Sequence, residues 1–163
     1  MEYTKLLDRW KTHFSHDPQM LSEFKAISEN KDEIISRFSS DLEFGTAGLR
    51  GVMGIGTNRF NIYTVRKATQ GLADYLNSTY SPASGVVSFD SRINSDVFAK
   101  ETAAVLAANG ITAYISKQLA PTPFLSFSVR ELHCSAGVMI TASHNPSEYN
   151  GYKCYGSDGS QMP

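Results

Sequence analysis

Apolar residues in the first part of the chain recur three and four positions apart, which is the spacing of α-helices. Asp17 stands before Pro18 as an N-cap stands before a proline in the first helical turn. Asn30 stands three residues before Glu33, which resembles a capping box. The pattern predicts a helical lead-in over residues 1–43. Its apolar stripes are more typical of a packed core than of a partner-binding helix.

The stretch that follows, FGTAGLRGVMGIGTNRF at residues 44–60, contains five glycines. Glycine at this density favours loops and bends in which the backbone approaches another group closely. Helical spacing returns at Asn61 and continues to about Leu76, so a helix is expected there.

The rest of the chain alternates between short apolar runs and helical stretches. Strands are predicted at 86–89, 111–115 and 136–140, and helices at 95–109 and 124–133. Gly110 has the position at which glycine ends many helices. This alternation indicates βα units. We therefore predict an α/β fold: a three-layer domain with a mostly parallel or mixed sheet between helices, preceded by the N-terminal helical segment.

Polar loops follow each predicted strand, at residues 90–92, 120–123 and 141–146. The carboxyl ends of parallel strands meet at one edge of a sheet, and ligands bind at that edge in open α/β folds. We therefore expect these three loops, which are distant in sequence, to be neighbours in space.

The loop TASHNP, residues 141–146, contains the most specific candidate for a functional site. Ser143 follows an apolar strand and could present its hydroxyl at the sheet edge, where backbone N–H groups of the turn could hold an anion. The alternative is an ordinary turn serine beside a polar His144. A serine hydrolase using this pair is a rival interpretation, but the nucleophile-elbow pattern GxSxG is absent.

Two basic residues could accompany that serine. Arg50 lies between glycines in GLRG, where the backbone can approach a phosphate and the guanidinium can bind it through two N–H groups. Lys153 follows Asn150-Gly151, a strong turn signal, and is expected to start a short strand. The alternative for each is a solvent-facing basic side chain.

Composition narrows the function further. The 163 residues fit one domain, and a net charge of −1 argues against nucleic acid and against a membrane surface as partners. Two cysteines without CxxC spacing favour a reducing, cytoplasmic compartment. The first residues resemble neither a signal peptide nor a membrane anchor. P-loop, zinc-ligand and DxDxD patterns are absent, and a dinucleotide-binding interpretation of GVMGIG is weak.

Five motifs occur in the same order as in the α-D-phosphohexomutases, and the chain most closely resembles the branch that includes phosphoglucomutases and phosphopentomutases. They are FGTAGLRG, DSR at 90–92, PTP at 121–123, TASHNP at 141–146 and NGYK at 150–153. The first and fourth are highly specific in combination. The resemblance covers essentially the whole chain, with residues 44–163 similar to the family's first domain, shortened at its C-terminal end.

This resemblance implies a reversible shift of phosphate between two hydroxyls of one sugar phosphate, through a phosphoserine and a bisphosphorylated sugar. It makes Ser143 the phosphoserine and a partial ligand of Mg²⁺, with a sugar bisphosphate as activator. Arg50, His144, Asn145 and Lys153 would bind phosphate, and His144 and Lys153 would also assist proton transfer. Asp90, Arg92 and Thr122 would support the site. A phosphate of about −1.5 to −2 charge agrees with this set of cations.

Complete members of that family are several times longer and bring the other metal ligands and the sugar-contacting loops from later domains. We therefore expect this chain to be a first-domain fragment that is inactive alone. We also expect an exposed apolar sheet face that favours self-association. Glucose phosphate is the first expectation for the substrate, and pentose or mannose phosphates are alternatives. A non-catalytic module that binds sugar phosphates is the alternative of another class.

Overall fold

The computed structural model describes residues 2–46 and 48–162. Ala47, within the FGTAGLRG motif, lies outside the described residues. Three helices fill the predicted lead-in: α1 (Glu2–Phe14), α2 (Pro18–Ile27) and α3 (Lys31–Phe38). The side chain of Asp17 caps α2 and that of Asn30 caps α3, each by accepting two backbone N–H bonds at 3.1 Å. These capping interactions confirm the predicted helix starts.

These three helices bury an apolar cluster of their own, which includes Phe14, Ile27, Ile34 and Phe38. Ile55, from the glycine-rich stretch, completes that cluster and is fully buried. An ion pair strengthens the attachment: Arg37 binds Glu23 at 2.6 Å, and Glu23 accepts the backbone N–H of Ile55 at 3.0 Å. The lead-in is thereby held against the segment that follows β2.

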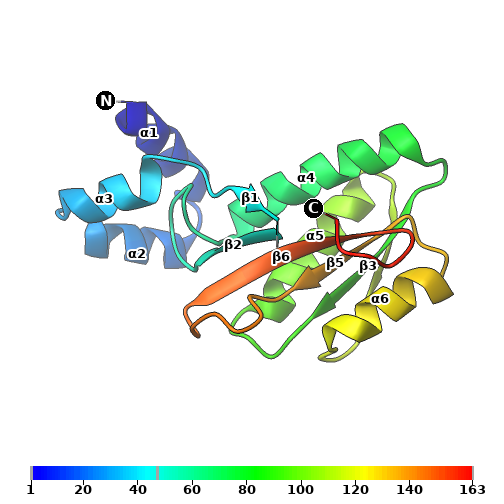
Figure 1. Ribbon diagram of the computed structural model, residues 1–163. Coiled ribbons are helices and arrows are strands. Elements are labelled where there is room, and N and C mark those ends of the chain that lie inside the picture. Colours follow the sequence, from blue (N-terminus) through cyan, green and yellow to red (C-terminus); the bar gives the residue numbers. More distant parts are fainter. Residues whose placement is uncertain (1, 47, 163) are drawn as a thin grey trace.

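A mixed sheet of six strands forms the centre of the molecule (Figure 1). Its strands are β1 (Phe44–Gly45), β2 (Gly48–Val52), β3 (Ser84–Phe89), β4 (Thr112–Ile115), β5 (Ala136–Ile140) and β6 (Tyr149–Gly156), in the order β1-β2-β6-β5-β3-β4. Strands β4, β3 and β5 are parallel and confirm the predicted βα units. Strands β6, β2 and β1 extend the sheet in antiparallel fashion.

Strand β2 corrects the expectation that residues 44–60 form only loops and bends. Its glycines hide the usual strand pattern because they are needed for close packing. A Cβ on Gly51 would lie 2.9 Å from the Leu42 side chain, and one on Gly48 would lie 2.4 Å from the carbonyl oxygen of Tyr152. Glycine here allows a strand to pack closely against its neighbours.

Helices cover both faces of the sheet, which confirms the three-layer fold. Helices α4 (Ile62–Thr79) and α5 (Ser95–Ala108) bury the larger core on one face, and α6 (Thr122–Glu131) packs on the other (Figure 1). Helix α6 begins two residues before its predicted start because Pro123 is tolerated in the first helical turn. No helix among the described residues is both long and apolar enough to cross a membrane.

Candidate functional site

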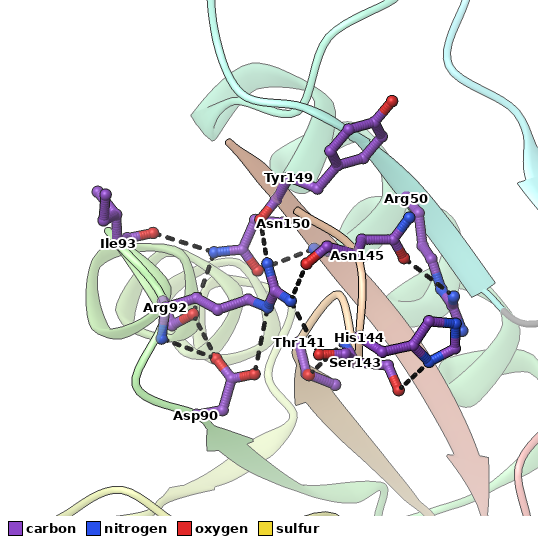
Figure 2. Close-up of polar contacts among 12 residues, drawn as sticks. Arg50, Asp90, Arg92, Ile93, Thr141, Ser143, His144, Asn145, Tyr149 and Asn150 are labelled. Atoms are coloured by element: carbon purple, nitrogen blue, oxygen red, sulfur yellow. Dashed lines mark hydrogen bonds and ion pairs between the residues drawn. The ribbon is translucent and has the colours of Figure 1, made fainter. Parts of the chain in front are cut away.

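The loops after β3 and β5 contact each other at the carboxyl ends of these parallel strands (Figure 2). Arg92, in the loop after β3, reaches the loop of residues 141–148 that joins β5 to β6 and the first residue of β6, Tyr149. The expected proximity of these two loops is confirmed. Ala120, in the third loop, donates its N–H to the last residue of β3 at 3.0 Å. Among the described residues, Thr122 forms no hydrogen bond with the loops that follow β3 and β5. The structure therefore shows no contact through which Thr122 would support the site.

Ser143 lies exposed at the tip of its loop, with its backbone in the left-handed region at φ 57°. Its backbone N–H donates to Oγ1 of Thr141 at 2.9 Å. Its Oγ is 3.4 Å from Nδ1 of His144, which is too long for a strong hydrogen bond. The hydroxyl is thus accessible to a substrate, and the geometry gives no sign of the base-activated nucleophile that a serine hydrolase requires.

Arg92 holds the Ser143 loop from one side (Figure 2). Its two terminal nitrogens donate to four backbone carbonyl oxygens, those of Ser143, Asn145, Pro146 and Tyr149, at 2.6–3.0 Å. The side chain is only 14% exposed, and its Nε lies 3.7 Å from the Asp90 carboxylate. Such a fork of charged donors fixes the loop more firmly than single neutral hydrogen bonds would.

A series of hydrogen bonds from buried side chains holds Asp90 in position. Asn150, completely buried in β6, donates to the carbonyl of Ile93 at 3.1 Å and to the hydroxyl of Ser95 at 3.0 Å. Ser95 donates to Asp90 at 3.0 Å. Ser95 and Asn150 were not among the residues expected to support the site. The sequence signal at Asn150-Gly151 indicated a turn. That prediction is wrong, because both residues lie in β6 and pair with residues of β2.

Gly151 explains how Arg50 reaches the same loop. Arg50 is paired with Gly151 across β2 and β6. A Cβ on Gly151 would lie 2.5 Å from the carbonyl oxygen of Thr141 and 3.2 Å from Cγ of Arg50. The bare glycine therefore leaves room for the arginine side chain, whose Nη1 donates to Oδ1 of Asn145 at 3.2 Å. The Nε of Arg50 is buried and has no hydrogen-bond partner among the described residues.

Lys153 projects from the same face of the sheet as Arg50, because positions 151 and 153 share one side of β6. It is the fifth residue of β6 and does not start the strand as expected. The side chain is nearly buried, with 9% of the residue exposed. Burial, and then the charge of Arg50, lower the pKa of Lys153 below its ordinary value, while the Asp90 carboxylate acts in the opposite direction.

Arg50 and Lys153 form no ion pair within the described part of the chain. Two cationic groups on one sheet face, one with a buried unused N–H, lie where an anion would be stabilised electrostatically. Asp90 does not satisfy them, since its carboxylate is engaged by Arg92 and Ser95. The arrangement can therefore hold a negatively charged group next to an exposed hydroxyl.

A divalent cation lacks a ligand set of its own here. Within residues 2–46 and 48–162, no three His, Cys, Asp or Glu side chains gather as metal ligands would. Ser143 could offer a single oxygen, and Asp90 is already bound by Arg92. Magnesium prefers several oxygen ligands in octahedral geometry. The residues described do not by themselves fit a complete magnesium site.

Comparisons with known proteins identify relatives of this chain. The chain is 50% identical to a phosphoglucomutase of Staphylococcus saprophyticus over 135 residues, which are 83% of this chain and 24% of that protein. It is 48% identical to the phosphoglucomutase of Staphylococcus aureus over 140 residues, covering 85% of this chain and 25% of the relative. The chain thus spans about a quarter of the length of these relatives.

Solved structures show the same fold. A putative phosphomannomutase from Thermus thermophilus superimposes with a TM-score of 0.70 at 34% identity, over 76% of this chain and 27% of that chain. A phosphoglucomutase/phosphomannomutase family protein from Burkholderia thailandensis gives a TM-score of 0.62 at 24% identity, over 74% and 27%. The family model "Phosphoglucomutase/phosphomannomutase, alpha/beta/alpha domain I" matches residues 41–163. The chain belongs to the phosphoglucomutase/phosphomannomutase family and contains its first α/β/α domain.

Proposed function

We propose that this chain carries the phosphoserine part of a sugar-phosphate mutase site. One observation carries the proposal: Arg50 and Lys153, two cations without an acidic partner among the described residues, accompany the loop that exposes the Ser143 hydroxyl. A phosphate ester on Ser143 would bring about −1.5 to −2 charge, which the positive charges of Arg50 and Lys153 would balance.

The proposed reaction consists of two phosphoryl transfers, one from the serine to the sugar and one from the sugar back to the serine. The P–Oγ bond of phosphorylated Ser143 breaks as a free hydroxyl of a sugar monophosphate bonds to phosphorus, and that hydroxyl gives up its proton. The sugar bisphosphate then returns its other phosphoryl group to the serine oxygen, and a proton goes back to the sugar oxygen that leaves. Phosphoryl transfer of this kind depends mainly on positioning and charge stabilisation, which fixed cations supply.

The basic residues divide the work by their position. Arg50 would neutralise the phosphoryl oxygens through its guanidinium, whose Nη1 already reaches the Ser143 loop at Asn145. Lys153 has a lowered pKa and would therefore exchange a proton more readily than an exposed lysine. His144 is exposed beside the serine and would contact the incoming substrate. Asn145 would act by orienting Arg50, since its side-chain oxygen accepts from Nη1.

Three finer assignments belong to the same proposal. Glucose phosphate is the proposed substrate, because the two curated relatives described above are phosphoglucomutases, with pentose and mannose phosphates as alternatives. Mg²⁺ would gain one oxygen ligand from phosphorylated Ser143 and take its others from outside this chain. Both cysteines are free thiols, which supports a reducing, cytoplasmic location.

The test is intact-mass spectrometry of the chain after incubation with a glucose bisphosphate. We expect the mass to increase by one phosphate, mapped by peptide analysis to Ser143. Ser143→Ala should abolish the increase, and Ser147→Ala, an exposed serine in the same loop, should leave it unchanged. Binding of the sugar without phosphorylation, unaffected by Ser143→Ala, would support a non-catalytic binding module in its place. Labelling of Ser143 by a fluorophosphonate probe would support a hydrolase.

A further inference from the structure

We propose that Arg92 is a positioning residue for the phosphoryl group: by holding the carbonyl oxygen of Ser143, it turns the backbone N–H of His144 toward the phosphate that Ser143 would carry. The inference rests on the proposed function and adds a backbone donor to the anion site. It also gives a specific role to an arginine that would not itself touch the substrate.

The direction of the His144 N–H follows from the contacts of Arg92. Nη2 of Arg92 donates to the carbonyl oxygens of Ser143 at 2.8 Å and of Asn145 at 2.6 Å, one on each side of His144. The peptide bond between Ser143 and His144 is trans. The C=O and N–H of a trans peptide point in opposite directions. The N–H of His144 therefore points away from Arg92.

Among the described residues, this N–H is also unused, unlike those of the residues on either side of it. The N–H of Ser143 donates to the Thr141 hydroxyl, and that of Asn145 donates to the carbonyl of Ala142 at 3.1 Å. Within the described part of the chain, the N–H of His144 has no acceptor. It belongs to the residue that directly follows the proposed phosphoserine, so an oxygen of the phosphate is within reach of a local hydrogen bond.

The backbone of Ser143 shows that something must hold this arrangement. A non-glycine residue at φ 57° is strained relative to ordinary backbone conformations. It persists only where surrounding contacts compensate. Arg92, fixed by Asp90 and only 14% exposed, provides four of these contacts from one rigid group.

Arg92 separates the carbonyl oxygens of the loop, which it binds, from the N–H donor on the opposite side of the Ser143–His144 peptide. Four carbonyl oxygens, which would repel a phosphate, are bound by one guanidinium. The opposite side of the Ser143–His144 peptide offers an N–H donor, and Arg50 offers a further one in its unused Nε. Loss of Arg92 would free those carbonyl oxygens to reorient, so the phosphate would lose a donor and face negative dipoles.

The test uses this chain, isotopically labelled, with phosphoserine installed at position 143 by genetic code expansion, beside the same chain with serine. In the parent, phosphorylation should move the amide proton resonance of His144 downfield, as a hydrogen bond to a charged acceptor does. In Arg92→Lys and in Arg92→Gln this displacement should fall by more than half. Lysine keeps the charge and glutamine keeps a planar donor, but neither can bind four carbonyls at once.

Arg66→Lys is the matched control, because Arg66 pairs with Glu101 on another part of the surface. It should retain the full displacement. Resonances of β5 and β6 confirm that each variant is folded. An equal displacement in the folded Arg92 variants, or none in the parent, overturns the proposal. Neither result touches the proposed function, which is judged by phosphorylation of Ser143 from a sugar bisphosphate.

Discussion

At the residue scale, Lys153 combines a positive charge with a nearly buried position, since only 9% of the residue is exposed. It lies on the same sheet face as Arg50 and forms no ion pair among the described residues. Burying a charge without a partner costs free energy, and an incoming phosphate would relieve that cost. In the proposed function, Lys153 would therefore lower the stability of the folded chain and favour the binding of a negatively charged group.

A pH titration of stability tests this point. The pKa of Lys153 is lowered in the folded chain, so between that value and the unfolded value the unfolded state binds more protons. Stability contributed by this residue therefore rises as pH increases through that window. Lys153→Met should gain about 1 kcal/mol at neutral pH, since a partly desolvated charge without an ion-pair partner among the described residues is removed. In urea unfolding, the advantage of the variant should shrink in alkaline buffer, and an advantage that grows would contradict the assignment.

Arg50 gives a second prediction at this scale. Arg50→Lys keeps the charge but loses the hydrogen bond to Asn145 and the unused Nε. Phosphorylation of Ser143 by a sugar bisphosphate should slow at least about tenfold, because a hydrogen bond to a charged group contributes about 1.5–3 kcal/mol. Mass spectrometry over time measures the rate. Arg66→Lys should match the parent, and equal rates for Arg50→Lys would remove Arg50 from the site.

Only part of the candidate site could be found in the sequence. Ser143 follows an apolar strand and Arg50 lies between glycines, so both patterns were visible. Arg92 and Asp90 drew attention through a loop at the expected sheet edge, but their contacts were not visible. The role of Asn150 could not be predicted from the sequence. Its hydrogen bonds to Ile93 and Ser95 depend on the register of β6 in the sheet, which residues distant in sequence determine.

At the scale of elements, glycines decide how β2 and β6 come together. The apolar pattern that identifies β3, β4 and β5 is interrupted in β2 by Gly48 and Gly51, which pack against backbone and a leucine. A rule that assigns loops to glycine-rich stretches fails here because the strand lies close to its neighbours. The helices were easier to predict, since their caps and spacing are local properties.

Gly151→Ala tests the importance of that close packing. The added methyl group would meet the carbonyl oxygens of Thr141 at 2.5 Å and Leu49 at 2.9 Å, both backbone atoms that cannot yield easily. We expect a loss of about 3 kcal/mol in urea unfolding. Gly71→Ala, in α4, meets no atom within 4 Å and should gain about 0.5–1 kcal/mol. A neutral Gly151→Ala would contradict the proposed passage of Arg50 over this glycine.

At the scale of the whole molecule, an apolar cavity of about 810 Å³ opens between α1, α4 and the sheet. Residues lining it include Trp10, Leu42, Phe44, Leu49, Leu72 and Tyr75. We propose that it makes the isolated chain associate with itself, as large exposed apolar surfaces do. Light scattering should show a mass that increases with concentration. Tyr75→Glu should reduce the association, and Phe127→Glu, an exposed apolar residue on α6, should not. A monomer at all concentrations would refute this.

Turnover is a second property of the whole molecule. The chain spans about a quarter of its curated phosphoglucomutase relatives. A site that needs more cations and oxygen ligands than Arg50, Lys153 and Ser143 provide should have negligible mutase activity alone. A coupled assay that detects glucose 6-phosphate formed from glucose 1-phosphate measures this. Turnover at the rate of a complete relative would show that these 163 residues suffice.

In the proposed function, a phosphate on Ser143 would lie among the positive charges of Arg50 and Lys153. Phosphorus NMR of the chain with phosphoserine at position 143 measures the second pKa of that phosphate, which is about 6 for an isolated group. We expect a pKa below that value, shifted back toward it in both Arg50→Ala and Lys153→Met. A phosphate that titrates near 6 in the parent and in both variants would show that these cations do not surround it.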